Sequence, residues 1–428
     1  MAYRVLAQLL ERVYIRRFGK WLWVCMGRPR QNAGNVEGTG VVEIAQPRSF
    51  APLPGVDPTA LHGTSDKTAT GKEHFEVLDG LRGTAALLVV LFHIQGITVG
   101  WQGSKVVLHH APLAVDFFFA LSGFVMGYAY DDRWAKMTTG RFLALRLIRL
   151  HPLVILGTLL GFASYLLDPL AGTAQLAPLH EVLVALGMGL LLLPSWPLPN
   201  RWTDTHPLNG PCWSLLQEYI GNLAYAFVLR RLPARVLGIL AALSGAVLVA
   251  CAATLGSLDH GAGWERFWMA PVRLCFPFLT GLWLYRMRDR LPRVRFGWLP
   301  LSAVMVIAMA FPILPVVGGV KINGLYEAAC VVLLFPAIIV AGRHSEAGRG
   351  MVGLCKASGR ISYPIYITHF PFLYVWMNYV ANGKPSQAQL VGIGIALVPC
   401  LLLVAWAAYT FWDEPIRKRL RARLLQQR

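Results

Sequence analysis

Apolar stretches of about 17–25 residues recur between Val77 and Trp412, and each is long enough to cross a lipid bilayer as a helix. Hydrophobic residues make up 55% of the 428 residues and charged residues only 14%, whereas roughly 25% of the residues in a soluble domain are charged. A segment inside a bilayer must satisfy its backbone polar groups internally, which a helix does. The sequence therefore predicts an all-α polytopic membrane protein.

We expect about ten transmembrane helices and one further apolar segment that does not cross. The predicted spans are 77–97, 112–130, 148–167, 213–229, 236–256, 267–285, 298–316, 324–341, 361–380 and 389–412. The segment 182–194 is short and ends in the Pro-rich run PSWPLPN. We interpret it as a re-entrant or surface helix on the outer side, where a cavity tolerates irregular backbone.

The basic residues fall mainly on one side of these spans. One set of alternate connections, counted with the C-terminal tail, carries 23 Lys and Arg, and the other set carries five. Because positive loops stay in the cytoplasm, this asymmetry predicts that both termini are cytoplasmic. We expect a multi-pass protein of the plasma membrane. The formal net charge of +18 therefore reflects topology, and no binding motif accompanies it that would indicate a nucleic-acid partner.

Three regions follow from composition. Residues 1–75 form a basic, largely disordered cytoplasmic extension, because Gly, Pro, Ser and Thr are frequent and no hydrophobic period is present; 2–26 within it could form an amphipathic helix. Residues 76–414 form the transmembrane domain, and 415–428 a basic cytoplasmic tail. The seven cysteines form no CxxC or Cys/His cluster, so we expect neither a disulfide framework nor a metal site.

Two ionisable residues lie eleven positions apart in the first span, Arg82 and His93. Eleven residues make about three helical turns, roughly 16 Å of rise, so both side chains leave the same face, with Asp79 one turn below Arg82. Ionisable residues inside a span usually face a cavity or a partner and indicate function. This face is therefore predicted to be the wall of a polar site.

A second basic pair, Arg146 and Arg149, stands in the sequence RLIRLHP after the second span. Guanidinium groups three residues apart can bind phosphate in a bidentate manner. We expect a phosphate-binding loop on the cytoplasmic side. The alternative is a charge pair that only contacts lipid headgroups and orients the helix.

Seven segments in a fixed order resemble the membrane-bound acyltransferase 3 family. They are LDGLRGTAALLVVLFH, DFFFALSGFVMGYAY, RFLALRLIRLHPL, WSLLQEYIGNLAYA, FPFLTGLWLY, SYPIYITHFPF and FWDEPIRKRL, over about residues 75–420. The resemblance implies transfer of an acyl group, with acetyl expected, from cytoplasmic acyl-CoA to a hydroxyl of an extracytoplasmic glycan, lipid-linked sugar or small acceptor. Acyl-CoA would be a co-substrate, with no tightly bound cofactor.

The resemblance also assigns catalytic roles. His93 is predicted to act as the base or to carry the acyl group, since imidazole titrates near pH 6.5; the alternative is a local hydrogen bond at the membrane interface. Glu218 would hold the other ring nitrogen of a histidine, although the second acid often found beside it in the family is Tyr219 here. Arg82 would contact CoA or orient Asp79, unless it is only a snorkelling anchor.

Four residues are candidates for substrate binding: Asp116, Ser214, Tyr366 and His369. Asp116 opens the second span and is expected either to approach His93 or to cap the helix. Ser214 is expected to line the site. Tyr366 and His369 share a helix face, where they would line a substrate channel or form a hydrogen-bond network between helices.

The competing interpretation is a transporter or flippase that uses the same histidine and arginine as a relay. Transporters of this size usually show paired repeats or broken helices in matching positions. We find neither pattern in the sequence, which favours the acyltransferase.

Overall fold

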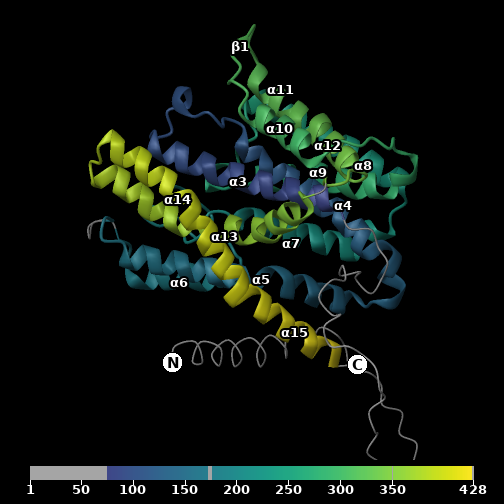
Figure 1. Ribbon diagram of the computed structural model, residues 1–428, viewed down its shortest axis with the longest axis horizontal. Coiled ribbons are helices and arrows are strands. Elements are labelled where there is room, and N and C mark those ends of the chain that lie inside the picture. Colours follow the sequence, from purple (N-terminus) through teal and green to yellow (C-terminus); the bar gives the residue numbers. More distant parts are fainter. Residues whose placement is uncertain (1–74, 172–175, 349, 427–428) are drawn as a thin grey trace, which may run out of the picture. The chain divides into compact units, whose positions relative to one another are not determined.

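The computed structural model describes residues 75–171, 176–348 and 350–426, which form a mostly helical domain (Figure 1). The predictions for 1–74, including the amphipathic helix at 2–26, lie outside the described residues. The long helices are α3 (Glu76–Thr98), α4 (Ala114–Tyr130), α5 (Thr139–Leu167), α7 (Cys212–Phe227), α8 (Ala234–Leu255), α9 (Met269–Arg286), α10 (Trp298–Met309), α13 (Val352–Asn382), α14 (Gln387–Ala407) and α15 (Glu414–Gln426).

Shorter elements complete the domain. They are α6 (Leu179–Leu190), α11 (Ile322–Ala329), α12 (Phe335–Gly342) and a two-stranded hairpin of β1 (Val316–Val317) and β2 (Val320–Lys321). A π-helical turn, Cys330–Leu334, joins α11 to α12, and another, Ala408–Asp413, joins α14 to α15. All ten predicted spans contain helix, but those at 213–229 and 298–316 hold helices of only 16 and 12 residues.

Among the described residues, six helical segments are long and apolar enough to cross a membrane. They are Glu76–Thr98, Ala111–Lys136, Thr139–Leu167, Ala234–Leu255, Ile322–Gly342 and Gln387–Gln426. Their burial is incomplete: only 11% of the most apolar window of the last segment is buried within the protein. Apolar surface of that extent is what lipid would cover.

Helix α3 packs along α13, and α4 packs along α9. Glycines make the second contact possible. A Cβ atom on Gly123 would stand 2.0 Å from the carbonyl oxygen of Phe278, and one on Gly281 would stand 1.9 Å from that of Ala120. Small residues allow such close approach of helices. Gly123 and Gly281 therefore let the backbones of α4 and α9 come into direct contact.

The arginine pair of RLIRLHP lies inside a helix and not in a loop. Helix α5 begins after Thr138, whose Oγ1 accepts a hydrogen bond from the backbone amide of Arg141 at 3.2 Å, and it continues through Arg146 and Arg149 for 29 residues. The predicted loop is wrong for Arg146, because the helix begins at Thr139 and not at 148, and Glu218 of another helix supplies a carboxylate to this arginine, as described below. Arg149 falls within the predicted span 148–167.

The segment between α6 and α7 is irregular, and its second half, 204–211, is buried. Arg201, with 1% of its surface exposed, lies between the rings of Tyr165 and Tyr374 at 4.8 and 4.0 Å from their centroids. The Thr205 amide donates to the carbonyl of Ala262 at 2.9 Å. Residues 191–211 are thereby fixed against the loop that joins α8 to α9.

Candidate active site

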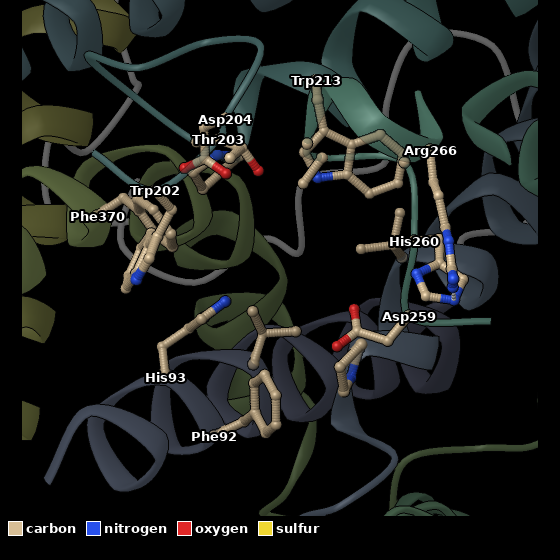
Figure 2. A pocket seen from close by; sticks show the side chains of 18 of the residues that line it. Phe92, His93, Trp202, Thr203, Asp204, Trp213, Asp259, His260, Arg266 and Phe370 are labelled. Carbon is tan, nitrogen blue, oxygen red and sulfur yellow. Dashed lines mark hydrogen bonds between the residues drawn. The ribbon is translucent and has the colours of Figure 1, made fainter. Parts of the chain in front are cut away.

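A cavity of about 570 Å³ lies where α3 and α13 meet the 191–211 segment and the α8–α9 loop. We call it the first cavity, and Figure 2 shows its side chains converging from these separate elements. Three tryptophans and two phenylalanines line it together with charged side chains: Trp101, Trp202, Trp213, Phe92, Phe370, Asp204, Asp259, Glu265 and Arg266.

His93 extends from α3 into the first cavity (Figure 2). Its Nδ1 lies 3.4 Å from Nε2 of His369, and Nδ1 of His369 lies 3.0 Å from the carbonyl oxygen of Ile365. A carbonyl oxygen only accepts, so neutral His369 carries its proton on Nδ1 and accepts from His93 through Nε2. The proton of His93 is then on Nδ1, which leaves the lone pair of its Nε2 available to take a proton.

Asp204 lies across the first cavity from His93 (Figure 2). Only 8% of its surface is exposed, and its Oδ2 accepts a hydrogen bond from the hydroxyl of Tyr374 at 3.1 Å. Burial raises the pKa of Asp204 to about 7, although the bond from Tyr374 and the charge of Arg201 oppose the rise. This carboxyl therefore titrates near neutral pH.

A second cavity, of about 310 Å³, is strongly basic. Six arginines from α3, α5, α13 and α15 line it: Arg82, Arg146, Arg149, Arg360, Arg417 and Arg421. Arg82 is held by α13, since its Nε donates to Ser362 Oγ at 2.9 Å and its Nη2 donates to the carbonyl of Gly359 at 2.6 Å. The same Nη2 lies 3.1 Å from Oδ1 of Asp79. The three arginines predicted to contact the acyl donor thus share one cavity.

The two cavities share a wall, because Val115 and Tyr366 line both. The Ser214 hydroxyl donates to the carbonyl of Pro211 at 2.9 Å, so the Tyr366 hydroxyl donates to Ser214 Oγ at 2.8 Å. Ser214 itself lines the second cavity. A ligand that extended past Tyr366 would reach from the arginines toward His93.

Glu218 does not hold a histidine, contrary to the prediction. Its Oε1 is 2.6 Å from a terminal nitrogen of Arg146 and accepts a hydrogen bond from Ser122 Oγ, also at 2.6 Å. The side chain lines the second cavity, and the histidine that contacts His93 is its neighbour His369. The physical reason is charge: Arg146, nearly buried, requires a carboxylate, and Glu218 supplies it.

Asp116 neither caps α4 nor contacts His93. It is fully buried and receives three hydrogen bonds from Arg273, the shortest at 2.6 Å. Helix α4 has no side-chain cap. Because Arg273 also donates to the carbonyl of His260 at 2.9 Å, Asp116 fixes an arginine that holds the α8–α9 loop at the first cavity.

Sequence reasoning missed the 191–211 segment and the α8–α9 loop, and it missed the arginines of α13 and α15. A signal was present: the run RWTDTH combines aromatic, acidic and basic residues next to a Pro-rich stretch. Within the described part of the chain, no group of three or more His, Cys, Asp or Glu side chains is placed to hold a metal ion.

Comparison with known proteins finds a matching family model and several similar proteins. A family model described as an acyltransferase domain, Acyl_transf_3, matches residues 75–410. The chain is 29% identical to the acyltransferase MdmB of Streptomyces mycarofaciens over 379 residues, 80% of this chain and 92% of MdmB. It is 35% identical to protein 2 in the picA locus of Rhizobium radiobacter over 190 residues, 42% of this chain and 96% of that protein. No solved structure is a significant match.

Proposed function

The chain belongs to the acyltransferase 3 family of membrane-bound O-acyltransferases, and we propose that it transfers an acyl group from acyl-CoA in the second cavity to a hydroxyl in the first. The observation that carries this proposal is the common wall formed by Val115 and Tyr366. Two substrates that enter separate cavities would meet there, within reach of His93.

The second cavity suits the acyl donor. CoA carries a diphosphate and a 3′-phosphate, and arginine binds phosphate through paired N–H groups. Arg82, Arg146 and Arg149 all line this cavity. Acetyl-CoA is the donor we expect, and the acyl-bearing arm would extend past Ser214 and Tyr366.

His93 supplies the base in this proposal. Its Nε2 takes the proton of the acceptor hydroxyl as the oxygen attacks the thioester carbonyl. The C–S bond then breaks, and the protonated imidazole returns the proton to the departing thiolate. A route through an acyl-histidine uses the same nitrogen. Glu218 does not contact the reacting groups in this proposal; its role is to hold the guanidinium of Arg146 at the second cavity.

The first cavity suits a glycan or a lipid-linked sugar as acceptor. Its tryptophan faces can pack against the apolar side of a sugar ring, and Asp204 and Asp259 can accept hydrogen bonds from hydroxyl groups. A cavity of about 570 Å³ falls in the range of sites for small ligands. This lining favours a polyhydroxylated acceptor over a purely apolar one.

The chain is an integral membrane protein with six apolar helical segments long enough to span. We propose that the remaining helices bring the number of crossings to about ten, in the plasma membrane. With both termini cytoplasmic, the basic second cavity would open toward the cytoplasm and the first cavity toward the outside.

Inside-out vesicles that contain the wild-type protein or the His93→Ala variant test the proposal. Acetyl-CoA labelled in the acetyl group is added, and the label is followed into acceptors inside the vesicles. We expect transfer with the wild type and a loss of about 10²–10⁴-fold with His93→Ala, the contribution of a general base.

The outcomes separate the two candidate functions. If neither protein consumes acetyl-, succinyl- or longer acyl-CoA in the presence of native acceptor membranes, the transporter interpretation replaces the enzyme. If His93→Ala retains full activity, the enzyme stands and the role of His93 is wrong. His344→Ala is the matched control, because His344 lies outside the residues that line either cavity.

A further inference from the structure

The C-terminal helix α15 is docked against the domain and does not trail away from it. Helix α14 continues through the Ala408–Asp413 π-helical turn into α15 (Figure 1), and α15 packs on α5. Within the turn, Trp412 Nε1 donates to the carbonyl of Pro152 in α5 at 2.7 Å. Such π-helical turns occur often at functional sites, and two residues of this one, Tyr409 and Asp413, line the second cavity.

Two arginines of α15 complete the basic lining of the second cavity. Arg417 and Arg421 are four residues apart, on one helix face, and both line the cavity. Arg417 is fixed by an ion pair at 3.1 Å with the buried Asp413. Lys418 and Arg419 of the same helix are exposed and line neither cavity.

The carboxylates near the second cavity neutralise only half of its arginines. Three ion pairs account for the neutralised half: Arg82 with Asp79, Arg146 with Glu218, and Arg417 with Asp413. Among residues 75–171, 176–348 and 350–426, no carboxylate lies within ion-pair distance of the other three, Arg149, Arg360 and Arg421. Unpaired guanidinium groups around one cavity favour a ligand that carries several negative charges.

We propose that Arg421 of α15 and Arg360 of α13 bind phosphates of the nucleotide part of CoA, with Arg417 beside them. The proposal rests on the proposed function, and it makes the C-terminal helix part of the acyl-donor site. A lipid headgroup offers similar phosphate chemistry. The number of unpaired arginines favours CoA, because CoA brings a diphosphate and a 3′-phosphate to one place.

Equilibrium binding of radiolabelled CoA to the full-length protein in phosphatidylcholine nanodiscs tests the proposal. Arg421→Ala and Arg360→Ala/Arg421→Ala are the test variants, because among the described residues neither arginine forms an ion pair with a carboxylate. Arg419→Ala is the matched control, with the same charge change two residues away on the same helix. We expect Kd for CoA to rise about tenfold or more in the test variants, as for the loss of a hydrogen bond to a charged group, and to stay within about twofold in the control.

A donor fragment without phosphates separates contact from a general effect on the fold. S-Acetyl-pantetheine should be used equally well by the wild type and by Arg421→Ala, whereas adenosine 3′,5′-bisphosphate should compete with CoA only in the wild type and the control. Equal weakening of the pantetheine fragment and of CoA would overturn the proposal, since it would indicate a disturbed fold.

The remaining outcomes are also decisive. An unchanged Kd for CoA in both test variants would overturn the proposal while the acyltransferase assignment stood. If those variants instead lost preferential binding of phosphatidylglycerol in mixed-lipid nanodiscs, the arginines would belong to a lipid site. A wild-type protein that bound no CoA would contradict the proposed function itself.

Discussion

At the scale of single residues, the side chain of His369 favours one tautomer of His93. His369 Nε2 is the acceptor 3.4 Å from His93 Nδ1, so its removal takes away the side-chain acceptor that favours the proton on Nδ1. We predict that His369→Ala lowers kcat by about 10–100-fold, less than the loss of the base itself, with little change in KM for acyl-CoA. His369→Gln, whose amide oxygen can accept the same hydrogen bond, should recover part of the rate. Steady-state kinetics of the two variants check this, and equal activity of both would refute the positioning role.

Asp204 gives the protein a pH dependence whose sign follows from burial. Its pKa is about 7 in the folded protein and about 3.9 in an unfolded chain. Between these values the unfolded chain loses its proton while the folded protein keeps it, so stability falls as pH rises through this window and levels off above pH 7.

We predict that Asp204→Asn removes this fall. Asparagine stays neutral and its carbonyl oxygen can still accept from Tyr374. The apparent Tm in detergent, measured from pH 4.5 to 8, should decline with pH by roughly 2 °C or more in the wild type relative to the variant. Parallel curves for the two proteins would show that Asp204 is ionised in the fold throughout.

At the scale of elements, the hydrophobic runs predicted where the helices lie along the chain, but they predicted the first and last residues of the helices less accurately. Helix α7 has only 16 residues and α10 only 12. After α10 the chain enters a largely exposed stretch, 311–320, that contains two prolines, two glycines and the β1–β2 hairpin, so the apolar run does not continue as a helix. The predicted span at 148–167 also began too late: α5 starts at Thr139 and contains Arg146, which lies 2.6 Å from Glu218 of another helix. Partners that lie far apart in the sequence decide such cases, and one sequence does not reveal them.

The contact of α4 with α9 yields a prediction about packing. A Cβ atom on Gly281 would stand 1.9 Å from the carbonyl oxygen of Ala120, a backbone atom that cannot rotate away. We predict that Gly281→Ala lowers the apparent Tm in detergent, by an overpacking cost of about 1–3 kcal/mol. Gly392→Ala in α14 is the control: no atom lies within 4 Å of its new methyl group, and alanine favours a helix by roughly 0.5–1 kcal/mol. If both variants melted alike, the close approach of α4 and α9 would be wrong.

At the scale of the whole molecule, the sequence indicated the polar stripe of α3 but not what faces it. His93, Arg82, Arg146 and Arg149 do line cavities, because a periodic pattern is enough to place side chains on one helix. The opposite wall of the first cavity comes from loops with no period, joined through contacts such as the bridge between Asp204 and Gly263. That of the second cavity comes from other helices, far away in the sequence. The prediction for Glu218 failed for the same reason, since its position along the chain did not reveal which helices it would face.

The orientation of the whole domain gives a prediction that two lysines can test. Lys384, between α13 and α14, and Lys418, on α15, are both exposed and lie beyond opposite ends of α14. With both termini cytoplasmic, a membrane-impermeant maleimide should label Lys384→Cys in intact cells and Lys418→Cys only in inside-out vesicles. The wild-type chain, with its seven native cysteines, gives the background. Labelling of Lys418→Cys from outside intact cells would invert the topology. It would also put the basic second cavity on the side where acyl-CoA is absent, so the same experiment tests whether the proposed direction of transfer is physically possible.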